Sequence, residues 1–122
     1  MTSDMEKEMA RRARLITETE LQGAIIEYVH KLGGVVAHFR PAKTAHGWRT
    51  PVAADGKGFP DLVICVNGRT LFRELKRQSP TTSKLSPEQE AWGEWLTDAD
   101  SDWGVWRPMD WLDGTIEREL GA

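Results

Sequence analysis

The stretch GFPDLVICVNGRTLFRELK, residues 58–76, contains two largely apolar segments on either side of Asn67-Gly68. Asn-Gly between such segments is the strongest short-range signal for a β-hairpin with a two-residue turn. The sequence therefore predicts antiparallel strands over 59–66 and 69–77. In a hairpin with this turn, facing residues have numbers that add up to 135, so Asp61 is expected to face Glu74.

Two facing carboxylates repel each other, because directly opposed side chains of a hairpin have their Cβ atoms about 4.5–5.5 Å apart. A divalent cation offsets this repulsion, and carboxylate oxygens are the ligands that Mg²⁺ prefers. Lys76 lies two residues after Glu74 and is therefore expected on the same face. A metal beside a fixed cation suits phosphodiester cleavage, since both stabilise charge that grows on the phosphate. The alternative is an exposed Asp-Glu-Lys set in which Lys76 only neutralises Glu74.

Signals on both sides of the hairpin predict a single α/β domain over 15–122 with a mixed sheet flanked by helices. Residues 1–14 have no dependable apolar periodicity and are expected to be a flexible or helical N-terminal extension. Thr17 and Glu20 form the pattern of a capping box, and Ser86-Pro87 is a typical helix start. The expected elements are a helix from Thr17 to Leu32, a strand over 35–39, the hairpin, a helix from Ser86 to about Leu96, a strand over 103–107 and one terminal helix after Pro108.

The net charge of −3 is unevenly distributed along the chain. Residues 30–85 have ten basic and three acidic side chains, whereas residues 86–122 have two basic and ten acidic ones. A basic central segment suits a polyanion, although charge alone fits a solvated surface equally well. The longest apolar run, 62–66, is too short to cross a membrane, and we expect no secretory leader. The single Cys65 is expected to be a small buried apolar residue. It excludes intrachain disulfides, so we expect a cytoplasmic protein, in a bacterial host if it is phage- or prophage-encoded.

A polar loop between the first strand and the hairpin, residues 40–58, has basic residues on both sides of a tryptophan. This pattern suits phosphate contacts together with stacking on an unpaired base. The alternative is a solvated loop with one packed tryptophan. We favour DNA contact because the loop is next to the proposed site. The expected contacts are Arg40, Lys43, Trp48 and Arg49.

Further motifs occur in a fixed order around the hairpin. They are Thr17-Glu18 with Gln22, Gly58-Phe59-Pro60-Asp61-Leu62-Val63, Glu74-Leu75-Lys76, Leu85-Ser86-Pro87-Glu88-Gln89, and Val105-Trp106-Arg107-Pro108 with Asp110-Trp111. With these motifs the chain resembles the PD-(D/E)xK nuclease superfamily, and within it the VRR-NUC domain of virus-type replication-repair nucleases. The resemblance covers residues 17–112 and suggests a phage-type, stand-alone member. It implies a restriction-endonuclease-like fold and a DNA endonuclease that uses Mg²⁺ or Mn²⁺.

The resemblance also implies roles for individual residues. Asp61, Glu74 and the main-chain carbonyl of Leu75 would hold the metal, and Lys76 would orient or activate the attacking water. Glu18 would be the acid on the first helix, in preference to Glu20, which has a role in the capping box. Gln89 would touch the site or the substrate phosphate, and Arg77 and Lys84 would join the DNA contacts.

Branched DNA as the substrate, a role in replication, recombination or repair, and a homodimer follow from the same likeness. Two alternatives remain open. The first is a DNA-binding module that keeps the fold but does not cleave, against which the intact Asp61, Glu74 and Lys76 speak. The second is an interaction protein that uses the acidic, tryptophan-rich C-terminal third to bind another protein, without salt-dependent affinity for DNA.

Overall fold

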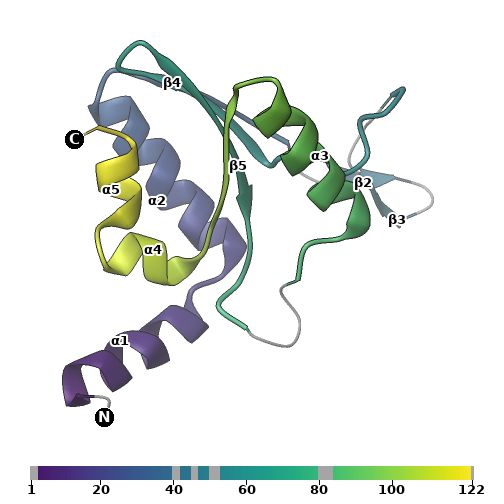
Figure 1. The fold of residues 1–122 in the computed structure, drawn as a ribbon. Helices are drawn as coiled ribbons and strands as arrows, with labels where there is room; N and C mark the ends of the chain where they lie inside the picture. The colour runs from purple at the N-terminus through teal and green to yellow at the C-terminus, as the bar shows by residue number, and fades with distance from the viewer. Residues whose placement is uncertain (1–2, 40–41, 45–46, 50–52, 80–83, 122) are drawn as a thin grey trace.

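A four-stranded mixed sheet lies at the centre of the computed structural model (Figure 1). The structure describes residues 3–39, 42–44, 47–49, 53–79 and 84–121, with the backbone alone for 42–44 and 47–49. The strand order is β1 (Val35–His38), β4 (Leu62–Val66), β5 (Arg69–Leu75) and β6 (Asp102–Trp106). β1, β4 and β5 are antiparallel neighbours, whereas β6 runs parallel to β5. The prediction of an α/β fold with a mixed sheet and flanking helices is confirmed.

The predicted hairpin and its register are confirmed by the pairing of β4 with β5. Val66 pairs with Arg69, and the ladder continues to Leu62 opposite Arg73, so each pair adds up to 135. Asn67 and Gly68 have φ values of 50° and 75°, which are the left-handed conformations that the tightest hairpin turn requires. The strand β4 begins later than expected, at Leu62, because the preceding Pro60 has no amide hydrogen to donate to a ladder.

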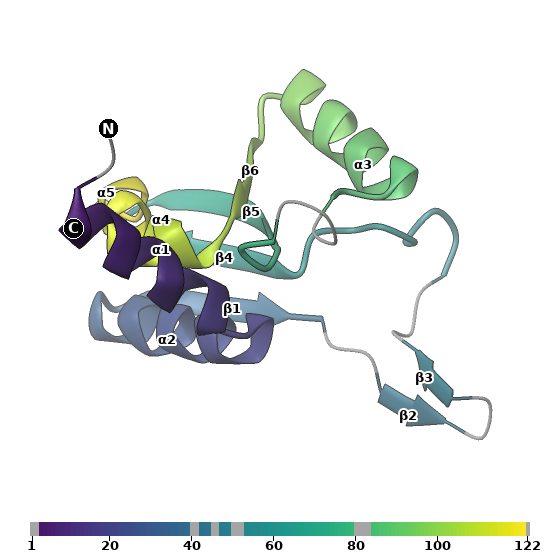
Figure 2. The same ribbon diagram turned by 90° about the horizontal axis from the view of Figure 1, so that it is seen from below.

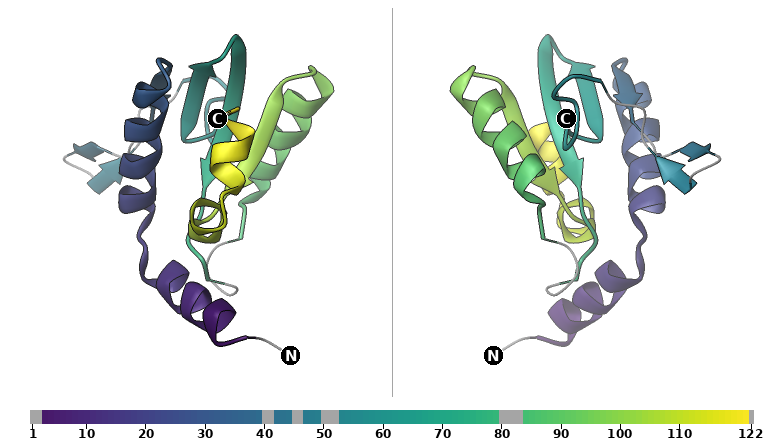
Figure 3. Two further views of the ribbon diagram at one scale, coloured as in Figure 1. Left: turned by 90° about the vertical axis from the view of Figure 1, so that its left-hand side faces the viewer. Right: turned by 90° about the vertical axis from the view of Figure 1, so that its right-hand side faces the viewer.

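Helices cover both faces of the sheet, with α2 (Glu18–Lys31) on one side and α3 (Pro87–Asp98) on the other (Figure 3). The core forms between α2, the sheet and α5 (Thr115–Glu119). Alternate residues of β4 and β5 point into it, as a half-buried antiparallel pair requires. Its buried side chains are Leu21, Ile25, Val29, Leu62, Ile64, Val66, Leu71, Leu75, Trp106, Ile116 and Leu120.

The single terminal helix expected after Pro108 is wrong. The structure has two short helices there, α4 (Pro108–Leu112) and α5, separated at Asp113-Gly114. Gly114 has a φ of 85°, a left-handed conformation that ends α4 and redirects the chain. The redirection places Ile116 and Leu120 in the core, where apolar periodicity alone would also have put them.

Two further expectations need correction. The segment expected to be a loop contains a small hairpin, β2 (Ala42–Thr44) and β3 (Gly47–Arg49), which lies apart from the main sheet (Figure 2). Cys65, expected to be a buried apolar residue, is exposed, because it alternates with the core-facing Ile64 and Val66. No helix among the described residues is long and apolar enough to cross a membrane.

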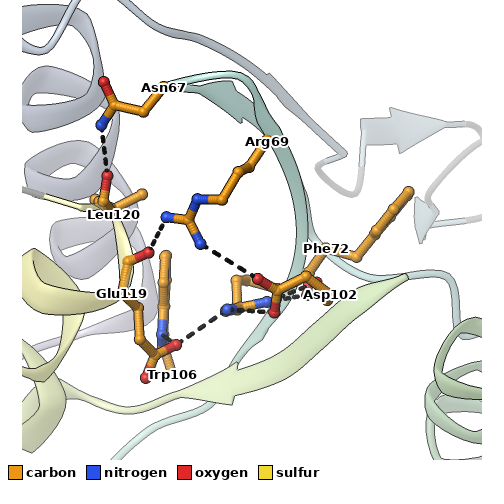
Figure 4. Close-up of polar contacts among 8 residues, drawn as sticks. Asn67, Arg69, Phe72, Asp102, Trp106, Glu119 and Leu120 are labelled. Atoms are coloured by element: carbon orange, nitrogen blue, oxygen red, sulfur yellow. Dashed lines mark hydrogen bonds and ion pairs between the residues drawn. The ribbon is translucent and has the colours of Figure 1, made fainter. Parts of the chain in front are cut away.

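A buried arginine of β5 ties α5 to the edge strand β6. Figure 4 labels its partners Asp102, Trp106 and Glu119. Arg73 is 3% exposed and donates to the main-chain oxygen of Asp102 at 2.7 Å. It also forms ion pairs with Asp102 at 2.9 Å and with Glu119 at 3.0 Å. The indole of Trp106 donates to the same oxygen of Glu119 at 3.0 Å and lies under the guanidinium. This network compensates the arginine for its loss of water and fixes the C-terminal helix on the sheet.

Candidate active site

The site begins at Asp61, the residue just before β4. Its main-chain oxygen accepts from the amide of Phe39 at 2.9 Å, so the ladder between β1 and β4 extends by one bond. Its side-chain Oδ2 accepts from the amide of Leu75 at 2.9 Å. Both contacts fix the carboxylate at the end of β5, beside Glu74. The expectation that Asp61 faces Glu74 therefore agrees with the observed register and with this hydrogen bond.

Glu74 is a buried carboxyl group, with only 3% of the residue exposed. Burial, the neighbouring charge of Asp61 and a hydrogen bond between the two carboxyl groups raise the pKa of Glu74 to about 9. Lys76 acts in the opposite direction. Without a bound cation the pair therefore keeps a proton at neutral pH. The alternative of an exposed Asp-Glu-Lys set does not fit this burial.

Gln89, on the first turn of α3, makes the direct contact with Glu74. Its Nε2 donates to Oε1 of Glu74 at 2.8 Å, while its own Oε1 accepts from the amide of Ser86 at 2.9 Å. The hydroxyl of Ser86 accepts in turn from the amide of Gln89 at 3.1 Å, which completes a capping box. The cap therefore fixes which way the amide group of Gln89 points. The Ser-x-x-Gln spacing is the sequence signal that predicts this device.

The segment that leads into Asp61 is held against α3. Gly58 has a φ of 85°, and a Cβ there would lie 2.6 Å from the carbonyl carbon of Glu88. The ring of Phe59 packs edge to face against Phe72 of β5 and Trp92 of α3, at centroid distances of 6.1 and 5.1 Å. One short segment thus fixes Asp61 and the start of α3 relative to β5. Sequence reasoning missed Gly58 as a packing residue, although a glycine before a structured motif is a signal for close approach.

The electrostatics place Glu18 and Lys76 at the same site. Burial first, and then the charge of Asp61, raise the pKa of Glu18, while Lys76 and Arg77 lower it. Glu20, in contrast, accepts from the amide of Thr17 at 3.0 Å in the capping box of α2. This geometry favours Glu18 over Glu20 as the helix acid.

Gln22 follows Glu18 by one turn of α2. It is buried, and its Nε2 has no hydrogen-bond partner among the described residues. A buried amide without a partner is costly unless a ligand or water satisfies it.

The other predicted DNA contacts are only partly within the described residues. Arg77 follows Lys76 directly and is exposed, and Lys84 is exposed in the segment before α3. Arg40 lies outside the described residues. For Lys43, Trp48 and Arg49 the backbone belongs to β2 and β3, but their side chains lie outside the described residues as well.

The donor set fits a hard divalent cation. Asp61 and the buried Glu74 are adjacent carboxyl groups whose charges repel each other, and oxygen donors of this kind suit Mg²⁺. Among the described residues, no three His, Cys, Asp or Glu side chains are grouped closely enough to hold a metal by themselves. A metal here would therefore need donors besides side chains, such as the main-chain carbonyl of Leu75 and water.

Comparison with known proteins supports this architecture. No family model matches the sequence, and no curated protein matches it. A solved structure described as a VRR_NUC domain has the same fold, with a TM-score of 0.59 and 24% sequence identity. The match covers 82% of this chain and 94% of the other chain. The expected restriction-endonuclease-like architecture is thereby confirmed, and the chain has the fold of a VRR_NUC domain.

Proposed function

We propose that this protein is a metal-dependent DNA endonuclease of the VRR-NUC type that uses Mg²⁺ or Mn²⁺. The observation that supports the proposal best is the buried Glu74 beside the half-buried Asp61, with each carboxyl group held by its own hydrogen bond near Lys76. Burying one carboxyl group directly beside another is costly for a protein that gains only stability from it. An arrangement of this kind is typical of functional sites. The motifs that resemble the VRR-NUC domain add support, and so does the shared fold.

The metal would be held by Asp61, Glu74 and the carbonyl of Leu75, where it would supply positive charge and acidify a bound water. Lys76 places a second positive charge on the same side of the sheet, where it orients the attacking water and stabilises the charge on the phosphate. Glu18 adds a carboxyl group from the first turn of α2, near enough to Asp61 for that charge to raise its pKa. In the hydrolysis the water oxygen bonds to phosphorus, and the bond from phosphorus to the leaving oxygen breaks.

In this arrangement Gln89 acts through Glu74, because its Nε2 donates to Oε1 of Glu74. It keeps that oxygen oriented. Groups that orient a ligating carboxylate in this way typically affect metal affinity or activity 10- to 100-fold. We therefore assign Gln89 as a positioning residue.

The substrate and assembly belong to the same proposal. We propose a structure-selective enzyme that cuts branched DNA in replication, recombination or repair, and that works as a homodimer. These points are supported by the likeness to VRR-NUC nucleases alone. A basic central segment beside the site, with ten basic and three acidic residues over 30–85, is consistent with a nucleic-acid substrate.

The test is cleavage of labelled four-way-junction, flap, duplex and single-stranded DNA in Mg²⁺, Mn²⁺ or EDTA, with wild type and Asp61→Ala side by side. We expect cutting that needs the metal and is lost in the variant, while DNA binding survives. The preferred substrate would identify the role of the enzyme, and the mass of the chain in solution would test the dimer. DNA binding without cleavage by folded wild type would instead support the silent binding module.

A further inference from the structure

The N-terminal helix α1 (Asp4–Leu15) is a fixed element of the structure. It begins with a capped first turn, in which Ser3 Oγ accepts from the amide of Glu6 at 3.1 Å. Ala13 is fully buried, α1 contacts α4, and Ile16 packs against the core. Figures 1 and 2 show α1 beside α4, extending outward from the beginning of α2. An exposed side chain on α1 therefore has a defined place relative to the rest of the domain.

One hydrogen bond joins the last turn of α1 to the segment after β5, and a second joins that segment to the start of α4. Arg77, the residue after Lys76, donates from Nη2 to the main-chain oxygen of Arg14 at 3.2 Å. Arg107, at the start of α4, donates from Nη1 to the main-chain oxygen of Arg77 at 2.9 Å. Arg77 therefore connects the C-terminal end of α1 to the end of β5, where Glu74 and Lys76 lie.

One side of α1 presents a stripe of basic residues. Lys7, Arg11 and Arg14 recur at the i, i+4, i+7 spacing that puts side chains on one helix face, and all three are exposed. The stripe spans roughly 10 Å along the axis at 1.5 Å per residue. This corresponds to about three steps of a DNA strand at 3.4 Å each. Arg11 forms an ion pair with Glu8 at 2.6 Å, which offsets its charge, so Lys7 and Arg14 are the residues to test.

Stabilisation of the helix explains only part of this stripe. Positive charge near the end of a helix interacts favourably with the helix dipole, which accounts for Arg14. The dipole gives no such advantage to Lys7, the fourth residue of α1. A ligand with regularly spaced negative charges explains both positions. A nucleic-acid strand that passes through the site has such charges on either side of the cleaved bond.

We propose that α1 is a phosphate-binding arm, in which Lys7, Arg11 and Arg14, continued by Arg77, contact the DNA backbone next to the bond cleaved at Asp61, Glu74 and Lys76. The inference rests on the proposed nuclease function and adds a surface to it. The arm extends the contact with the substrate beyond the site, so that affinity depends on a helix that holds no catalytic group.

The experiment compares the full-length double variant K7Q/R14Q with a matched double variant, K31Q/R118Q. Lys31 and Arg118 are also exposed and lose the same charge, but they lie on α2 and α5, away from α1. Binding of labelled duplex and four-way-junction DNA is measured over a range of salt concentrations in Ca²⁺. Cleavage by wild type and by both variants is measured in Mg²⁺ at limiting DNA.

Each lost phosphate contact lowers the slope of log affinity against log salt by about 0.9. For K7Q/R14Q we therefore expect a decrease of about 1.8 in slope and binding on the order of 60-fold weaker near 0.1 M salt. Cleavage at limiting DNA should fall in parallel. The charge-preserving variant K7R/R14K should restore binding, and K31Q/R118Q should bind and cut like wild type.

If K7Q/R14Q binds DNA with the same affinity and salt slope as wild type, and wild type still cuts DNA, the arm is refuted and the nuclease function stands. An equal loss in both Gln double variants would show an effect of net charge and would overturn the arm as well. A K7R/R14K variant that fails to restore binding would show that packing matters there instead of charge. A wild type that neither binds nor cuts DNA would refute the proposed function itself.

Discussion

Metal binding at the Asp61–Glu74 pair should release a proton. Because the pKa of Glu74 is about 9 without a metal, the carboxyl group is protonated at pH 7 and must ionise to bind a cation. Two pH units below this pKa, the ionisation costs about 3 kcal/mol at 1.36 kcal/mol per unit. Metal affinity should therefore increase by about tenfold per pH unit between roughly pH 6 and pH 8.

Calorimetric titration with Mg²⁺ or Mn²⁺ in two buffers of different ionisation enthalpy measures the proton number directly. We expect release of about one proton per metal at pH 7, for wild type and for the matched variant Glu27→Gln, whose exposed side chain lies on α2. Glu74→Gln should lose both the release and most of the metal affinity. Metal binding by wild type with the same affinity at pH 6 and pH 8, and without proton release, would refute this reasoning.

In EDTA, the stability of the wild type should fall by roughly 2–3 kcal/mol between pH 6 and 8, because the folded chain keeps the Glu74 proton that the unfolded chain, with a pKa of 4.5, has lost. In Glu74→Gln, the free energy of unfolding measured in urea should no longer depend on pH in this range. A wild-type stability that does not change between pH 6 and 8 would contradict the raised pKa of Glu74. Gly58→Ala should lower both stability and cleavage, because its Cβ would lie 2.6 Å from the backbone of α3. Gly68→Ala has open space around the new Cβ, so it should cost only the backbone strain of about 1–2 kcal/mol. Cleavage equal in these two variants would argue against the packing role. Gln89→Ala should reduce cleavage roughly 10- to 100-fold. Ser86→Ala should lose about 1 kcal/mol of helix capping and keep most of the cleavage. A larger loss of cleavage in Ser86→Ala than in Gln89→Ala would show that the cap matters, and not the contact with Glu74.

The sequence alone predicted the part of the site that lies on the hairpin. The Asn67-Gly68 turn allows one register, and a register fixes which residues face each other along the whole ladder. The placement of Asp61 opposite Glu74, with Lys76 two residues further on, follows from that turn by counting. The helix that starts at Ser86 was predictable for a similar reason, since the cap is a local pattern.

Contacts between distant segments could not be predicted in this way. The bond from Gln89 to Glu74 depends on how closely α3 approaches the sheet, which Gly58 allows through contact with the helix backbone. The pairing of Arg73 with Glu119 depends on the bend at Gly114, and no local spacing encodes it. The attachment of α1 through Arg77 is also long-range, since 63 positions separate that residue from Arg14.

The measurement that tests the central claim most directly compares wild type with Lys76→Ala and with Lys57→Ala in cleavage of labelled branched and duplex DNA. Lys57 is an exposed lysine that pairs with Glu88 and serves as the matched control. We predict cutting by wild type and Lys57→Ala that requires Mg²⁺ or Mn²⁺ and stops in EDTA, and no cutting by a folded Lys76→Ala protein that still binds DNA. No cutting of any substrate by folded wild type, or undiminished cutting by Lys76→Ala, would contradict the account.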